Sequence, residues 1–182
     1  MLTALLVYAV VAAQADTMPV VLAGGPSAST AGAAGTAAPK NMLADSVVLD
    51  KSSRQLTLYY RGQLVRTYGV ALGKNPVGDK ITRGDGRTPE GLYHIESRNP
   101  QSKYHLSLRI SYPDAAHRAL AAKRGVSPGG DVMIHGLPSA FAMIGALHRQ
   151  QDWTLGCIAV TNDEIEEIWR AVPDGAPILI RP

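Results

Sequence analysis

The sequence predicts an α+β domain dominated by antiparallel β-strands, with a few short helices inserted late in the chain. Short stretches rich in Val, Leu, Thr and Tyr recur from residue 46 onward, and Gly- and Pro-rich segments separate them. Helical patterns occur only after residue 113. The chain has 182 residues, of which 46% are apolar, so it is long enough to bury a hydrophobic core.

Six stretches have the pattern of strands: 46–50, 54–60, 63–72, 91–97, 131–135 and 177–182. Arg61 and Gly62 separate the second stretch from the third, which is the spacing of a tight hairpin. Residues 73–91, GKNPVGDKITRGDGRTPEG, hold too many Gly and Pro residues for regular structure. A loop of this length inside a compact domain is usually functional or mobile.

Helices are predicted in three places. Residues 114–125 have helical composition, and residues 139–150 begin a second helical pattern after Pro138. A third helix should start at Thr161, because Glu164 follows at the spacing of a capping box and apolar residues then recur at helical intervals.

The first 44 residues are predicted to precede the folded domain. Residues 1–15 hold an apolar run and end in a small-x-small pattern, so we expect a secretory signal peptide cut after Ala15. The run of about a dozen residues is too short to cross a hydrocarbon core of ~30 Å. Residues 16–44 are rich in Ala, Gly, Ser, Thr and Pro, as in a flexible tether. We therefore expect an exported, periplasmic protein that has no stable membrane insertion after cleavage, with its domain at 45–182.

The charge pattern argues against a nucleic-acid partner. The net charge is only +3, no basic run occurs, and one Phe, two Trp and seven Tyr offer few rings to interleave with cations. The most basic stretch, residues 61–87, holds six Lys or Arg against two Asp. We interpret it as a solvated loop face, with a rim that attracts substrate carboxylates as the alternative.

Cys157, in the stretch DWTLGCIAVTN, is the only cysteine of the chain. A single thiol in an exported protein is buried filler, an intermolecular bridge or a reactive group. Gly156 has no Cβ and lets the backbone approach a ligand. A nucleophilic thiol needs a base, and His135 at the end of a predicted strand is a natural partner. The other histidines compete for this role: His94, His105, His117 and His148.

Three blocks resemble the L,D-transpeptidase catalytic domain (YkuD-like), a family of enzymes of bacterial peptidoglycan. GDGRTPEGLYHI resembles its Thr-Pro-x-Gly segment, VMIHG its histidine strand, and TLGCIAVTN its cysteine signature. The matching positions are Thr88, Pro89, Gly91, His135, Gly136, Thr154, Gly156, Cys157, Ile158 and Asn162. The resemblance implies an antiparallel β-sandwich-like catalytic domain over residues 45–182. DWTxGCIAVTN is similar to a variant branch of the family.

The resemblance also implies roles for single residues. Cys157 would be the nucleophile, His135 the general base and acid, and Gly156 with the Cys157 amide the oxyanion site. Metals and organic cofactors are not expected, since one cysteine without metal-ligand spacing does not suggest zinc. Candidate substrate-binding residues are Thr88, Gly136, Thr154, Tyr104, His105 and Arg109, the last three on an extended segment that also holds Ser111. A packed strand with a solvated face is the alternative for that segment.

Two positions depart from the family pattern. Leu155 stands where the signature usually has histidine, and Ala159 where it usually has arginine. Leu155 cannot donate, accept or titrate, so the contribution of that histidine is either missing here or supplied elsewhere, for instance by His148 or His105. Without the arginine, a bidentate grip on a carboxylate is missing.

The implied reaction is acyl transfer on a peptidoglycan stem peptide through a Cys157 thioester. The thioester is then attacked by the amine of another stem, by the lysine of a wall-linked protein, or by water. If water resolves it, the protein is a hydrolase: an L,D-carboxypeptidase, or an amidase that releases wall-linked protein. A wall-binding module that lost turnover is a further alternative.

Overall fold

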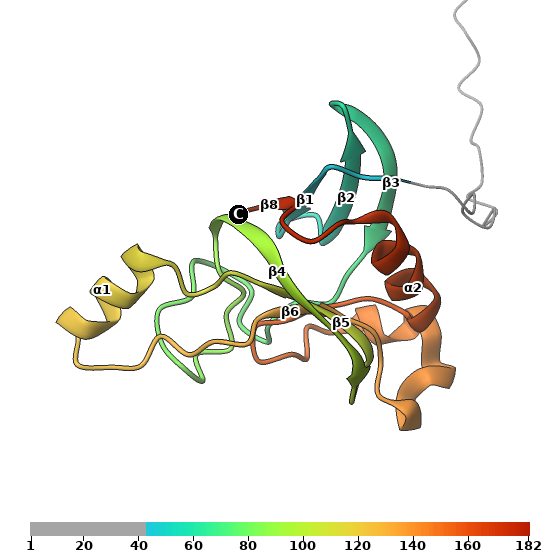
Figure 1. Ribbon diagram of the computed structural model, residues 1–182. Coiled ribbons are helices and arrows are strands. Elements are labelled where there is room, and N and C mark those ends of the chain that lie inside the picture. Colours follow the sequence, from blue (N-terminus) through green and yellow to red (C-terminus); the bar gives the residue numbers. More distant parts are fainter. Residues whose placement is uncertain (1–42) are drawn as a thin grey trace, which may run out of the picture. The chain divides into compact units, whose positions relative to one another are not determined.

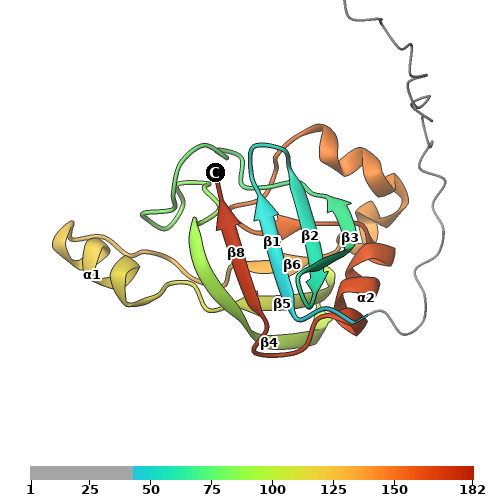
Figure 2. The same cartoon turned by 90° about the horizontal axis from the view of Figure 1, so that it is seen from above.

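The computed structural model describes residues 43–182; the expected signal segment 1–15 and tether residues 16–42 lie outside the described residues. The strands are β1 (Ser46–Asp50), β2 (Gln55–Tyr60), β3 (Gln63–Gly69), β4 (Gly91–Ser102), β5 (His105–Ile110), β6 (Met133–His135), β7 (Ile158–Ala159) and β8 (Pro177–Arg181). The helices are α1 (Ala115–Lys123), η1 (Ser139–Gln150) and α2 (Asn162–Ala171). Figures 1 and 2 show their arrangement. The β-dominated α+β prediction is confirmed.

The strands form one eight-stranded sheet in the order β3-β2-β1-β8-β4-β5-β6-β7. Most neighbours are antiparallel, but β1 pairs with β8 and β6 with β7 in parallel. The predicted antiparallel pairing thus dominates the sheet, and these two parallel pairs depart from it. Long connections that include helices join the strands of each parallel pair, as parallel pairing requires.

The sheet curls until its two ends meet. The chain just beyond β3 forms an isolated antiparallel bridge with β7, at the far end of the strand order, between Ala71 and Ala159. Both amides take part, with N···O distances of 3.0 and 2.9 Å. The curled sheet thus buries its own inner face, where a sandwich would use a second sheet.

Alternating apolar residues build the core. Along β1 and β2, every second residue is buried, including Val47, Leu49, Leu56 and Leu58. The predicted hairpin joins β2 to β3, and both Arg61 and Gly62 have positive φ, as a type I′ turn requires. The folded region includes Ala44, which is buried and donates its N–H to the carbonyl of Ala171.

The helices match the predictions with one exception. The α1 helix is capped by Asp114, and the capping box of α2 joins Thr161 to Glu164 as predicted. Residues 139–150 instead form a 3-10 helix that is interrupted at Gly145, whose φ of 49° is not helical. In the part of the chain that the structure describes, no side chain caps its start at Pro138. Among residues 43–182, no helix has the length and apolarity needed to cross a bilayer.

Candidate active site

The parallel pair β6–β7 brings His135 and Cys157 to one place. Ile158 pairs with Ile134 and Ala159 with His135, so Cys157 comes directly before the paired segment. On its other side β7 is held by the Ala71 bridge. Both His135 and Cys157 line a pocket of about 720 Å³. The sheet thus fixes the backbone of both residues.

Gly156 is needed because the backbone is crowded there. Its φ is +131°, and a Cβ would lie 2.5 Å from the carbonyl oxygen of Arg87. The Gly156 N–H donates to Thr154 Oγ1 at 3.0 Å, and the Thr154 hydroxyl donates to the Cys157 carbonyl at 2.8 Å. The Gly156 amide therefore already has an acceptor. Within residues 43–182, the Cys157 N–H has none, so it is the free donor for an oxyanion.

The thiol of Cys157 is protonated at neutral pH. Burial raises its pKa, and the Asp131 carboxylate adds a smaller rise, whereas the backbone N–H of Met133 and the ammonium of Lys80 oppose it. The Sγ atom donates to the backbone carbonyl of Asp131 at 3.6 Å, and in the described part of the chain no hydrogen bond joins it to His135.

His135 is neutral and oriented. The ring is buried, and its Nδ1 lies 2.7 Å from the carbonyl oxygen of Gly136, so Nδ1 carries the proton and donates it. This leaves Nε2 as the basic nitrogen. Burial lowers the His135 pKa, which the Gly136 carbonyl partly offsets. Tyr104 and Trp153 hold the ring, with centroids 4.3 and 5.8 Å from its own.

The pocket unites some of the predicted residues. Its walls include Tyr104, Arg109, Thr154, Gly156, Cys157 and His135. The Arg109 guanidinium lies 3.5 Å from Glu96 and 3.4 Å from Asp131.

Three predicted substrate-binding residues lie outside the pocket lining. Thr88 belongs to the 73–91 loop and is fully buried, and its Oγ1 accepts a hydrogen bond from the Gly73 N–H. His105 lies at the β4–β5 turn, 2.9 Å from Glu166. Gly136 allows close packing, because a Cβ would come within 2.6 Å of Asn162 Oδ1.

Two notable residues of the pocket wall, Trp153 and Lys80, were not among the candidates predicted from the sequence. Trp153 could have been recognised as a candidate, since it follows Asp152 in the stretch that holds the cysteine. Lys80 was included in a predicted solvated loop face, but its side chain is only 4% exposed. The sequence around Lys80 does not indicate burial, because several charged residues lie nearby and nothing marks Asp85 as its partner.

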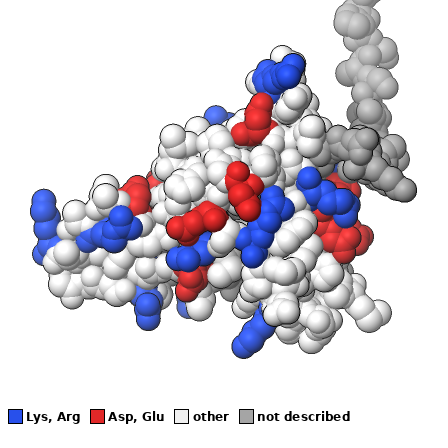
Figure 3. Space-filling view, viewed as in Figure 1, with Lys and Arg blue, Asp and Glu red and all other residues white. Residues whose placement is uncertain are grey.

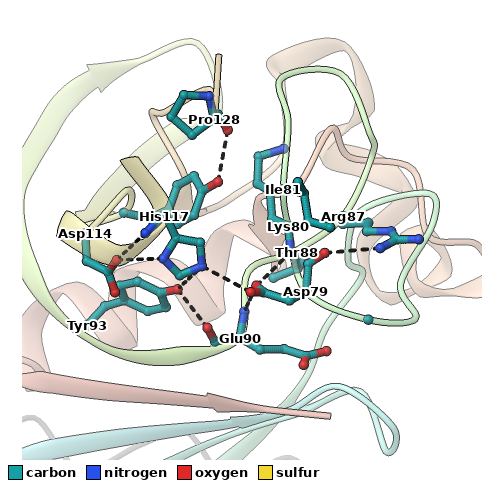
Figure 4. Close-up of polar contacts among 12 residues, drawn as sticks. Asp79, Lys80, Ile81, Arg87, Thr88, Glu90, Tyr93, Asp114, His117 and Pro128 are labelled. Carbon is teal, nitrogen blue, oxygen red and sulfur yellow. Dashed lines mark hydrogen bonds and ion pairs between the residues drawn. The ribbon is translucent and has the colours of Figure 1, made fainter. Parts of the chain in front are cut away.

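The 73–91 loop is irregular but well anchored. Lys51, also buried, donates to the carbonyls of Gly78 and Thr88 and lies 2.6 Å from Glu90. Figure 4 shows the tie to α1: His117 lies between Asp114 and Asp79, at 2.8 and 3.2 Å.

Charge on the visible face is mixed. Figure 3 shows Lys and Arg interspersed with Asp and Glu, without a large area of one sign. Among residues 43–182, no three His, Cys, Asp or Glu side chains converge as metal ligands.

The two departures from the family pattern have different surroundings. Leu155 is 68% exposed and lines the pocket. Ala159 is fully buried and bonded to Ala71 through both its N–H and its carbonyl. His148, which lies against Trp153, and His105 are not part of the pocket lining.

Comparison with known proteins agrees with this geometry. Residues 44–180 match the model of the L,D-transpeptidase catalytic domain family, YkuD. YafK of Escherichia coli strain K12, provisionally named as an L,D-transpeptidase, is 30% identical over 128 residues, which cover 67% of this chain and 44% of YafK.

Two solved structures share the fold. The helical cell shape determining protein Pgp2 of Campylobacter jejuni is 26% identical with a TM-score of 0.56, over 74% of this chain and 46% of Pgp2. Bd1075 of Bdellovibrio bacteriovorus is 26% identical with a TM-score of 0.54, over 76% of this chain and 48% of Bd1075. The chain spans less than half the length of each of these three relatives.

Proposed function

Since this chain belongs to the L,D-transpeptidase catalytic domain (YkuD) family, we propose that it is an exported cysteine acyltransferase that acts on peptidoglycan stem peptides. The observation that carries the proposal is the state of His135. With Nδ1–H bound to the Gly136 carbonyl, its Nε2 has no hydrogen-bond partner among residues 43–182 and can accept a proton in the pocket that Cys157 also lines.

The first half-reaction forms a thioester. The Cys157 thiol rotates away from the Asp131 carbonyl, and His135 Nε2 takes its proton while sulfur attacks the amide carbon after the third stem residue. The Cys157 N–H stabilises the oxyanion; a donor of this kind contributes about 3–4 kcal/mol. His135 then protonates the leaving amine of the terminal D-alanine as the C–N bond breaks.

The second half-reaction resolves the thioester. In a transferase, His135 takes a proton from the amine of another stem or of a protein lysine, which attacks the thioester carbon and releases the Cys157 thiol. One observation favours water as the second nucleophile. Ala159 is buried where the family usually has an arginine, so that residue offers no guanidinium to hold an acceptor carboxylate. We therefore keep hydrolysis as the second candidate.

The test is mass spectrometry of disaccharide-tetrapeptide incubated with the full chain, with and without a D-amino acid as acceptor. We expect D-amino-acid exchange or dimer formation, lost in Cys157→Ala and His135→Ala. The exposed His94→Ala is a matched control that should keep activity. Loss of D-alanine without exchange would identify the hydrolase. Absence of any product would reject both enzymes for this substrate and leave the wall-binding module.

A further inference from the structure

Lys80 is a buried cation with a fixed position. Its Nζ lies 2.8 Å from Asp85 Oδ1 and donates to the carbonyl of Thr82 at 3.3 Å. Asp85 in turn accepts from the backbone N–H groups of Ile81, Thr82 and Arg87. Burial alone would raise the Asp85 pKa, but the Lys80 ammonium and these N–H groups lower it to about 2. The pair is thus charged at neutral pH.

The backbone of Lys80 is held as firmly as its side chain. Its N–H donates to Asp79 Oδ1 at 2.7 Å, and the same oxygen accepts the N–H of Glu90 at 2.8 Å. The second oxygen of Asp79 lies 3.2 Å from His117 on α1 (Figure 4). Lys80 therefore cannot move without breaking contacts in two parts of the domain.

The ammonium of Lys80 lies at the wall of the nucleophile's pocket. Lys80, Gly156 and Cys157 all line this pocket, and a Cβ at Gly156 would lie 3.6 Å from Lys80 Nζ. An ammonium has three N–H donors. Two have acceptors, and in the described part of the chain the third has none. This N–H donor and the positive charge of the ammonium would stabilise negative charge that develops beside Gly156.

The other charged groups of the pocket are more exposed to solvent or are neutral. The Asp131 carboxylate opposes Lys80 by raising the Cys157 pKa, but it acts less strongly than Lys80, is 75% exposed and lies 3.4 Å from the Arg109 guanidinium. Arg83 lines the pocket and is exposed. His135 is neutral because burial lowers its pKa. Among these groups, Lys80 combines burial with a full charge, so solvent screens it least.

We propose that Lys80 is a positioning residue for the nucleophile: its buried ammonium, held by Asp85 next to Gly156, stabilises negative charge on the Cys157 sulfur and on the oxyanion formed there. Lys80 thus supplies positive charge in a site that has Ala159 where the family usually has an arginine. The catalytic consequence rests on the proposed function, whereas the effect on the thiol does not.

The test is the rate of Cys157 alkylation by iodoacetamide as a function of pH, measured on the full chain. In Lys80→Met, the apparent pKa of alkylation should rise by about one unit, which is a tenfold lower rate at a given pH below the pKa. Lys80→Arg should restore most of the wild-type profile. The double variant Lys80→Met/Asp85→Asn removes the unpaired carboxylate and should show the same rise.

Lys51→Met is the matched control. Lys51 is as buried as Lys80 and bound to Glu90, but it does not line the pocket. It should lower the melting temperature without moving the alkylation profile. A wild-type profile in folded Lys80→Met, or an equal shift in Lys51→Met, would overturn the proposal. Failure of both Lys80→Met and the double variant to fold would also overturn it, by assigning Lys80 to stability.

Alkylation needs no peptidoglycan, so this result is independent of the proposed function. A shifted profile in a protein that does not process tetrapeptide would support Lys80 and reject the substrate.

Discussion

Cys157 donates its thiol hydrogen bond to the backbone carbonyl of Asp131 and not to His135. Burial raises the Cys157 pKa and lowers the His135 pKa, so both residues are neutral at rest. The arrangement is therefore a thiol with a nearby base, and not a preformed thiolate–imidazolium pair.

This arrangement predicts the pH dependence of turnover. Protonated His135 cannot accept the thiol proton, and its pKa lies below the ordinary 6.5. We expect kcat/KM to be constant from pH 8 to pH 7 and to fall on acidification through a pKa below 6.5. Steady-state kinetics between pH 4.5 and 8 would check this. An acid limb centred above pH 6.5, or fast alkylation of Cys157 at pH 5, would contradict the neutral pair.

Gly156→Ala should damage both the site and the fold. The new Cβ meets the Arg87 carbonyl and the φ of +131° strains any side chain, so we expect a loss of about 2–4 kcal/mol in the free energy of unfolding. Gly62→Ala is the control, because Gly62 also has positive φ but no atom within 4 Å. It should cost only about 1 kcal/mol. Urea denaturation compares them, and equal losses would refute the role of crowding.

Restoring the usual family residue should cost little stability at position 155 and much more at position 159. Leu155→His places a polar ring on an exposed position of the pocket and should change stability by less than about 0.5 kcal/mol. Ala159→Arg forces a charge into the closed core beside Ala71 and should cost about 3 kcal/mol or more. Thermal unfolding of both variants would measure these two changes in stability. A stable Ala159→Arg would show that the bridge can open.

His148 should make the fold sensitive to acid. Burial, aided by the nearby Arg149 charge, lowers the His148 pKa to about 4, and its Nε2 is buried without a partner in the described part of the chain. Between pH 6.5 and about 4 the unfolded chain binds the proton more readily, so stability falls as pH falls through this window.

His148→Phe should therefore lose less stability than the wild type between pH 7 and pH 5, with stability at pH 7 little changed. Urea denaturation at the two pH values measures this difference. The exposed His94→Phe is the control and should behave as the wild type does. If His148→Phe lost as much stability as the wild type between pH 7 and pH 5, His148 would be ruled out as the source of the acid sensitivity.

Local patterns made much of this structure predictable. The Arg61-Gly62 turn and the Thr161–Glu164 capping box depend on neighbours in sequence, and both were found where predicted. The 3-10 geometry of residues 139–150 was not, because helical composition does not reveal the backbone bend at Gly145.

Long-range pairing was the part that the sequence could not reveal. Nothing near β8 indicates that it would join β1 in parallel, and nothing near Lys80 indicates that it would be buried beside Cys157. Thr88 and His105 were predicted to bind substrate, Thr88 from the family resemblance and His105 from its place on an extended segment. Thr88 instead bonds to Gly73 of its own loop and His105 to the distant Glu166, and neither lines the pocket.

The Ala71–Ala159 bridge also bears on the order of folding. It joins residues far apart in sequence at opposite ends of the strand order, and such non-local contacts form only after much chain entropy has been lost. The hairpin of β2 and β3 can form early, whereas the support behind β7 comes with the final closure. A half-folded chain would therefore hold Cys157 and His135 without the geometry that the proposed reaction needs, and we expect the onset of thiol chemistry to report the completed fold.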